Sequence, residues 1–415
     1  MADAPSPQVT VADGARLRRR LARAERGGHW RALGLIAPLL LFLLASFVVP
    51  ISLMLSRSVY DASVHDNLPR TIAALKDWDG KDIPGETVFA ALAADLKDAQ
   101  ANNTAPQIGK RMNYEISGIR SEIISSAAAA ADFTAPPYKE QLLAANDIWN
   151  DPSTWAKIRQ AGSSLTPFYL LSAFDLQRND AGTVVPSDPE RAVYIDILKR
   201  TFFISLTVTL LTLLLGYPVA FMLANSPAWL ANMLMLLVLI PFWTSLLVRT
   251  TAWYVLLQDN GPINNVAHLI GITEPLKLIF SRAGTLIAMT HIQLPFTLLP
   301  IYSVMKGISP SYMRAARSLG GGPAYSFARI YFPLTLPGIG AGCLLTFILS
   351  LGYYITPALV GGPADQMISG TIADALNFES NWGKGCALGA VLLGATLILF
   401  YVYNRVLGID KVKLG

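Results

Sequence analysis

Charged residues are scarce in this 415-residue chain: Asp, Glu, Lys and Arg together make up 15% of it, whereas hydrophobic residues make up 53%. Ordinary soluble domains carry about 25% charged residues. The chain is therefore too apolar and too poor in charge for a soluble enzyme, and its composition indicates a membrane protein.

Cysteine and histidine are also rare, with two and four copies. Cys343 and Cys386 match no metal or redox motif, and we interpret them as small packing residues. The histidines lack metal-ligand spacing, and no nucleophile–base pair is recognisable. The sequence predicts no catalytic residue and no metal site.

A nucleotide-binding loop of the Walker A type is likewise missing. Gly383-Lys384 is followed by Gly385, and Phe378 stands where that loop requires its first glycine. The chain is thus expected to bind no cofactor. If ATP hydrolysis drives its function, another chain supplies it.

Long uncharged runs, in contrast, are abundant. A run of about 20 apolar residues is enough to cross the hydrocarbon core, and Asn225-Ser226-Pro227 divides the longest run in two. We expect an all-α membrane protein with six transmembrane helices, near residues 33–55, 200–224, 230–257, 284–306, 335–357 and 386–407.

Basic residues indicate how these spans are oriented. Seven arginines precede the first span, and Lys and Arg beside the membrane favour the cytoplasmic side. Both termini are then cytoplasmic, and the long segment after the first span lies outside. The expected organisation is a basic tail (1–32), a first span (33–55), an outer insertion (56–199), a five-helix core (200–407) with a cytoplasmic loop at 307–333, and a second tail (408–415).

The 56–199 insertion has helical patterns at 86–100 and 138–150. Its aromatic residues indicate a small packed subdomain rather than a loose tether: Trp149, Trp155, Phe168, Tyr169 and Phe174. Two roles remain open, a structural cover over the outer mouth or a docking surface.

The 307–333 loop contains signals for two short helices. Ser309 is a good N-cap, and Pro310 suits a first helical turn. Gly320 and its neighbours end that helix. Pro323 begins a second helix, and Pro333 is expected to stop it before the next span. On these signals alone an amphipathic hairpin at the membrane surface is the alternative.

This loop resembles the Glu-Ala-Ala loop of the permease subunits of ATP-binding-cassette importers. Ala315-Ala316, Gly320, Ile330 and Pro333 stand at the family's spacing, whereas Arg314 replaces the family's Glu and Phe332 its Leu. In that family the loop is the coupling helix that docks in a groove of the cytoplasmic ATPase.

The resemblance extends over about 200–405, where Pro241-Phe242-Trp243-Thr244 and Asn260-Gly261-Pro262 resemble the spermidine/putrescine branch. It implies a bacterial inner membrane, with the mainly helical 56–199 insertion in the periplasm. It also implies a heterodimeric pore with a second permease subunit, two copies of an ABC ATPase that binds ATP and Mg, and a periplasmic substrate-binding protein. The implied cargo is a polyamine, with opines, amino-acid derivatives, phosphonates or iron as alternatives. An ion-driven secondary transporter and a membrane-anchored sensor are the rival classes.

Polar residues inside or beside spans are costly and therefore point to function. Arg249 is expected to form a structural or gating ion pair, with Asp259 or Glu379 as partner. We name as candidate pathway residues Asp259, His291, Gln293, Tyr353, Tyr354 and Glu379. The alternative for the uncharged members is hydrogen bonding between helices.

Overall fold

The computed structural model describes residues 34–407, so the tails 1–32 and 408–415 lie outside the described residues. The chain is mostly helical and divides into two units: the first ends at Ser56 and the second begins at Arg57. The described part of the first unit is an apolar helix, Gly34–Arg57, whose last residue already belongs to the second unit. It has a π-helical turn at Leu44–Val48 and a last segment labelled α2 (Val49–Arg57). Its length and composition suit a membrane span.

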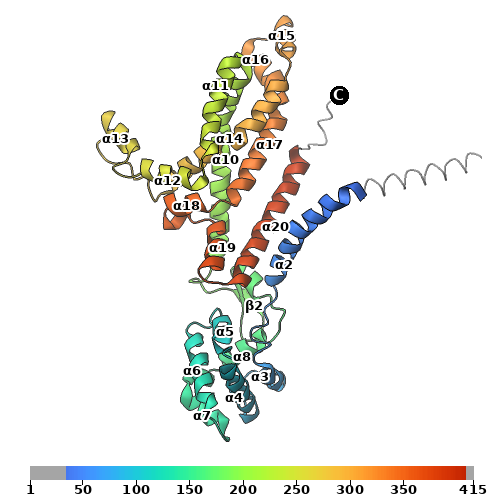
Figure 1. Cartoon of the computed structure of the whole chain (residues 1–415), viewed down its shortest axis with the longest axis vertical. Coiled ribbons are helices and arrows are strands. Elements are labelled where there is room, and N and C mark those ends of the chain that lie inside the picture. The colour runs from blue at the N-terminus through green and yellow to red at the C-terminus, as the bar shows by residue number, and fades with distance from the viewer. Residues whose placement is uncertain (1–33, 408–415) are drawn as a thin grey trace, which may run out of the picture. The chain divides into compact units, whose positions relative to one another are not determined.

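The second unit begins with a helical subdomain drawn in blue to green in Figure 1. Its elements are α3 (Pro69–Ala74), η2 (Leu75–Asp77), α4 (Glu86–Ala101), α5 (Ala105–Met112), α6 (Ile119–Ala131), α7 (Tyr138–Ala145), η3 (Asp147–Asn150), α8 (Pro152–Ala161), α9 (Phe168–Ala173), β1 (Leu176–Arg178) and β2 (Val184–Pro186). The two strands pair antiparallel, with Gln177 opposite Val185.

The subdomain has its own hydrophobic core, as the aromatic residues predicted. Trp149 and Trp155 are fully buried, and Phe89 packs edge-on against Trp155 at 4.8 Å between ring centroids. Tyr169 is buried in a second core, which it shares with Ala387 and Leu388, and Phe174 is half exposed. A backbone bridge between Tyr60 and Leu165 closes the two ends of the subdomain, so it is folded rather than tethered.

Fourteen further elements follow within the described part of the chain. They are α10 (Tyr194–Asn225), α11 (Ala228–Leu239), η4 (Ile240–Trp243), α12 (Leu246–Leu256), α13 (Pro262–Leu269), α14 (Arg282–Gly307), α15 (Pro310–Ser318), α16 (Pro323–Ser326), η5 (Phe327–Tyr331), α17 (Phe332–Leu351), α18 (Ile355–Val360), η6 (Pro363–Asp365), α19 (Ile368–Asn377) and α20 (Trp382–Leu407).

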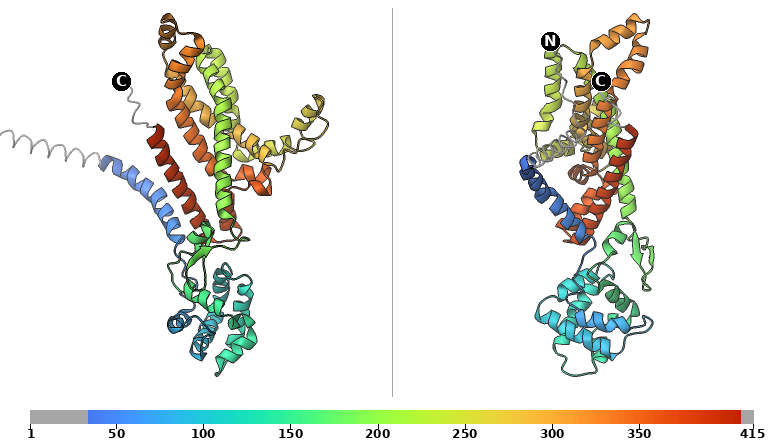
Figure 2. Two further views of the ribbon diagram at one scale, coloured as in Figure 1. Left: turned by 180° about the vertical axis from the view of Figure 1, so that it is seen from behind. Right: turned by 90° about the vertical axis from the view of Figure 1, so that its right-hand side faces the viewer.

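Helices α10, α14 and α17 lie side by side and form the centre of the bundle (Figures 1 and 2). Thr297 of α14 shares hydrogen bonds with Thr212 of α10 (2.8 Å) and Thr346 of α17 (2.6 Å). Gly342 lies so close to Thr297 that an added Cβ would meet its carbonyl oxygen at 2.5 Å. Small residues and interhelical hydrogen bonds are how helices associate in lipid.

Five described helices are long and apolar enough to span a membrane, and a bent pair makes up to six. The segment expected to form the span at 230–257 is broken in the structure: Ala228–Trp243 and Leu246–Leu256 meet at 99°, and they make a sixth span only if the pair counts as one. Pro241 lacks an N–H to continue the helix. Thr244 is extended, and the Ser245 side chain caps a new helix by accepting from Val248 N at 3.3 Å. In Figures 1 and 2 the α12–α13 segment extends away from the central helices.

Candidate functional site

The loop between α14 and α17 begins as its sequence predicted. Ser309 takes an extended conformation, and its hydroxyl accepts a hydrogen bond from Ser311 N at 3.3 Å. Pro310 occupies the first turn of α15, where its missing N–H costs no hydrogen bond. The segment from Ser309 to Tyr331 is called the hairpin below.

Gly320 makes the turn of the hairpin, with φ at +85°. Two hydrogen bonds close the end of α15, from Gly320 N to Arg317 O and from Gly321 N to Ala316 O, each 3.0 Å. This pattern requires a left-handed residue at position 320, and glycine adopts that conformation at little cost. Ala316 is 7% exposed because the chain folds back over it.

Pro323 starts α16 as predicted, but Pro333 does not end the second helix. A π-helical turn at Phe327–Tyr331 links α16 to α17, and the helix continues from Pro323 to Leu351. The wider turn bonds Phe332 N to Phe327 O, five residues back. It relieves the clash that a proline ring makes in a regular α-helix. Ile330 lies within this turn and Pro333 just beyond it.

Helix α15 has two distinct faces. Pro310, Met313, Arg314 and Arg317 recur at helical spacing and line a cavity of about 450 Å³, together with residues from the ends of α10 and α14. Tyr312, Ala315 and Leu319 lie on the opposite face and are exposed. Arg314, at the position of the family's Glu, therefore faces the cavity.

A second group of polar residues gathers where α12, α14 and the turn after α17 meet. The Trp253 indole donates to His291 Nδ1 at 3.1 Å, with the two rings 5.3 Å apart. Arg249 acts electrostatically on both His291 and Tyr353. His291 is exposed, so this group has an open side. Two predicted pathway residues thus lie together with the predicted charge.

The other candidate residues lie apart from this group. Gln293 is fully buried, and its Oε1 accepts from Ser350 Oγ at 2.8 Å, which is a bond between α14 and α17. Tyr354 is exposed in the turn after α17, because that helix ends at Leu351 rather than near 357. Asp259 is exposed in the turn after α12.

The expected ion pair of Arg249 does not form within residues 34–407. Glu379 instead pairs with Lys384, whose Nζ lies 2.9 Å from both carboxylate oxygens. Asp259 likewise has no ion pair with Arg249 among the described residues.

The sequence reasoning missed a buried charge cluster in the subdomain. Arg111 of α5 is 4% exposed; its Nε lies 3.1 Å from Asp61 Oδ2 and its Nη1 lies 2.8 Å from Glu115 Oε1. The Tyr169 hydroxyl donates to Asp61 Oδ2 at 2.6 Å. The aromatic ring of Phe168 stacks under Arg111 at 4.5 Å. The only local signal of this cluster in the sequence is the spacing of Arg111 and Glu115, which stand four residues apart and can pair on one helix face.

This cluster joins the subdomain to α20. Tyr169 belongs to α9, which packs against α20, and its ring lies where a Cβ on Gly383 would be, at 2.3 Å. Burial raises the pKa of Asp61, but hydrogen bonds from Tyr169 and Ser63 and the charge of Arg111 outweigh it, so that pKa lies below its usual value. Burial raises the pKa of Tyr169, which keeps its hydroxyl protonated as a donor.

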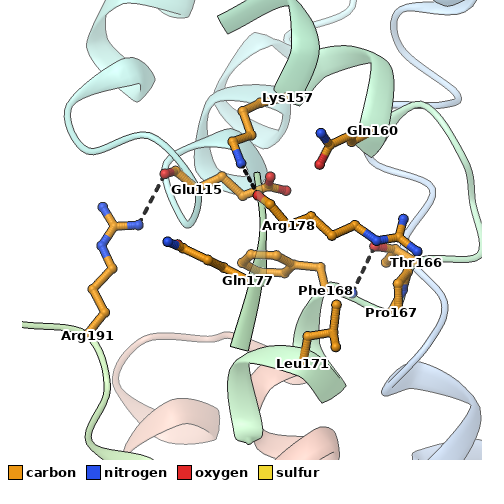
Figure 3. A pocket seen from close by; sticks show the side chains of 10 residues that line it. All are labelled: Glu115, Lys157, Gln160, Thr166, Pro167, Phe168, Leu171, Gln177, Arg178 and Arg191. Atoms are coloured by element: carbon orange, nitrogen blue, oxygen red, sulfur yellow. Dashed lines mark hydrogen bonds between the residues drawn. The ribbon is translucent and has the colours of Figure 1, made fainter. Parts of the chain in front are cut away.

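A small cavity of about 40 Å³ lies beside the cluster and is shown in Figure 3. Its polar groups bond to one another: Arg191 donates to the Glu115 carbonyl at 3.1 Å, and Lys157 donates to the Arg178 carbonyl. Such a small space with engaged polar groups suits structural contacts rather than cargo.

Known proteins resemble the bundle and the hairpin. The model of the family "Binding-protein-dependent transport system inner membrane component" matches residues 216–407. The spermidine/putrescine transport system permease protein PotB of Escherichia coli is 31% identical over 226 residues, which cover 54% of this chain and 82% of PotB. The inner membrane ABC transporter permease protein YdcU of the same organism is 30% identical, covering 51% of this chain and 74% of YdcU.

A solved bacterial alginate ABC transporter, in complex with an alginate-bound periplasmic protein, is similar at 19% identity and a TM-score of 0.42. The match covers 54% of this chain and 80% of the matched chain of the alginate transporter. The sequence likeness to PotB extends over most of that relative, and the match to the family model includes the hairpin. The chain therefore belongs to the binding-protein-dependent inner-membrane components, the permease subunits of type I ATP-binding-cassette importers.

Proposed function

We propose that this permease forms half of the translocation pathway for a small organic cation, a polyamine such as putrescine or spermidine. The observation that carries the cargo assignment is the 31% identity to permeases named for spermidine and putrescine, over 82% of the E. coli protein. Trp253 adds an aromatic face beside His291, and such faces attract organic cations.

The proposed topology has six spans, with the bent pair α11–α12 counted as one, and both termini in the cytoplasm. The hairpin is then cytoplasmic and the subdomain at 56–199 periplasmic. Figure 1 supports this, since the hairpin and the subdomain lie at opposite ends of the bundle. Cysteine substitutions at Leu319 and Ser380 test it: an impermeant maleimide added to intact cells should label the second and not the first.

The proposed assembly contains a second permease, two ABC ATPase subunits that bind ATP and Mg, and a periplasmic binding protein. In it the exposed face of α15, with Tyr312, Ala315 and Leu319, docks on the ATPase. The binding protein delivers the cargo to the outer mouth. We further propose that Arg249 is a gating charge whose surroundings change as the pathway opens.

The decisive experiment is uptake by the reconstituted complex. Radiolabelled putrescine or spermidine should accumulate only with ATP, the ATPase and the binding protein. Uptake that persists without the ATPase and follows a proton or sodium gradient would exclude the importer mechanism.

Another cargo class is the alternative, because Arg249 places a positive charge beside His291. Such a charge repels a polyamine and attracts an anionic group. Calorimetry on the cognate binding protein separates the two. Tight binding of an opine or phosphonate, without a response to polyamines, would overturn the polyamine assignment and leave the permease role intact.

A further inference from the structure

The largest cavity described above lies under the hairpin, with a volume of about 450 Å³. Its walls are apolar and aromatic and come from α10 (Phe221), α14 (Met305), α15 (Met313) and the π-helical turn (Phe327, Tyr331). The rings of Phe221, Phe327 and Tyr331 pack on one another at 5.4–5.7 Å between centroids. This gives the cavity a firm apolar floor.

Three cations line the same cavity: Lys306, Arg314 and Arg317. The sequence contains no Asp or Glu between Asp196 and Asp259, or between Glu274 and Asp365. All the residues that line the cavity fall within those stretches. Consistently, none of the three cations forms an ion pair with a described residue. The cavity thus has positive charge that no residue in the described part of the chain balances.

The three cations do not share the surface that is proposed to dock on the ATPase. Arg314 and Arg317 project from the cavity face of α15, whereas Tyr312 and Leu319 are exposed on the other face. The cavity walls, moreover, are the last turns of α10 and α14, two membrane-spanning helices. An apolar wall ending in cations at that depth matches the boundary between acyl chains and headgroups.

We propose that this cavity binds an anionic phospholipid, with Lys306, Arg314 and Arg317 around its phosphate and the aromatic floor against the start of its acyl chains. The proposal rests on the proposed cytoplasmic position of the hairpin. Guanidinium groups suit phosphate because their N–H donors match its oxygens. The bound lipid stabilises the position of α15 relative to the spans and so favours coupling.

Native mass spectrometry of the assembled complex tests the proposal, after detergent exchange and titration with phosphatidylglycerol or phosphatidylcholine. Each basic residue near an anionic surface contributes about 1 kcal/mol, which is about a five-fold change in affinity. Arg314→Gln should weaken phosphatidylglycerol binding about five-fold, and removing all three cations should abolish it. Phosphatidylcholine binding should not change.

Arg329→Gln is the matched control. Arg329 lies on the same hairpin and is exposed, but it does not line the cavity, so this variant should keep wild-type phosphatidylglycerol binding. Equal losses in Arg314→Gln and Arg329→Gln would overturn the proposal, since they would indicate nonspecific surface charge. Co-purification of wild-type amounts of the ATPase verifies that the variants still assemble.

Two other outcomes would also refute a lipid site. Unchanged lipid binding with loss of the ATPase would assign the cations to an acidic partner protein. Displacement of the lipid by millimolar inorganic phosphate would assign them to a soluble anion. None of these measurements requires transport, so a complex that binds the lipid through Arg314 but imports no cargo would contradict the proposed function alone.

Discussion

At the scale of single residues, the Asp61–Arg111–Tyr169 cluster shows how a buried charge is maintained. Arg111 is almost fully buried, and an unpaired cation there would cost several kcal/mol. Asp61 and Glu115 balance its charge, while Phe168 and Tyr169 cover its faces. The cluster joins α5, α9 and the segment just after the first span.

Asp61→Asn should destabilise the subdomain by about 2 kcal/mol at neutral pH, the range for hydrogen bonds to charged groups. The pKa of Asp61 is lowered on folding, so its stabilising effect is full above the unfolded pKa and is lost as pH falls through the folded pKa. The difference between variant and wild type should therefore shrink below about pH 4. Denaturation followed by Trp fluorescence measures it.

Asp98→Asn is a control for that pH dependence, because Asp98 is exposed and pairs with Arg70 at the surface. Surface pairs contribute at most about 1 kcal/mol. A pH-independent effect of Asp61→Asn would contradict a role for the ionised carboxylate.

Gly383 is the second residue-scale test, because a Cβ there would meet the Tyr169 ring at 2.3 Å. Gly383→Ala should lower stability by about 1–3 kcal/mol, the cost of overpacking, and should loosen α9 from α20. Gly394→Ala changes the same helix at a position with no atom within 4 Å of the new Cβ. Thermal melting of the purified protein should show a lower melting temperature for Gly383→Ala and no decrease for Gly394→Ala.

At the scale of elements, the hairpin depends on one left-handed residue between two short helices. Gly320→Ser should strain the turn by about 1–2 kcal/mol, since residues with a Cβ disfavour positive φ. Its expected result is continued ATP hydrolysis with less uptake per ATP. Gly322→Ser is the matched control, because Gly322 has a φ of −63° and occupies the N-cap of α16, where serine is favoured.

If the Gly320→Ser and Gly322→Ser variants take up the same amount of cargo per ATP hydrolysed, the hairpin only connects two spans. Uptake and ATP hydrolysis must be measured on the same proteoliposomes, because a loss of both activities would reflect poor assembly rather than uncoupling.

Elements with local signals were predictable from the sequence, and those with distant causes were not. Ser309, Pro310 and Gly320 define the hairpin through bonds within five residues, so their chemistry is readable. The π-helical turn at Phe327–Tyr331 depends on packing against Tyr217 and Phe221 of α10. No spacing rule within the loop reports such a contact, so the sequence predicts a stop at Pro333 that the structure does not have.

The same reasoning applies to the sites. Trp253 and His291 lie 38 residues apart, and Asp61 and Tyr169 lie 108 apart, so neither pairing has a sequence signature. Apolar runs predicted the long helices well, because a span is a property of composition. The 99° bend before α12 accompanies the hydrogen bond by which Ser245 caps that helix. Hydropathy averaged over a window does not detect such a bond, so the sequence does not predict the bend.

At the scale of the whole molecule, many apolar side chains of the spans face outward. Leu206, Leu210 and Leu214 of α10 are each more than half exposed, and so are Leu247 and Val248 of α12. Lipid accounts for part of such a surface. The polar group of Arg249, Trp253 and His291 is also open on one side, which lipid cannot satisfy. This favours a protein partner along that side.

The last prediction is that the partner is a different permease. A single chain presents one hairpin to the ATPase, whereas alternating access requires two halves that move against each other. Native mass spectrometry of the affinity-purified complex should find one 44.9-kDa chain with one second permease of different mass and two ATPase subunits. Two copies of the 44.9-kDa chain without a second permease would contradict the heterodimer. Disulfide trapping then locates the interface: a cysteine at position 247 or 248 should cross-link to the second permease, whereas one at 394, on α20, should not.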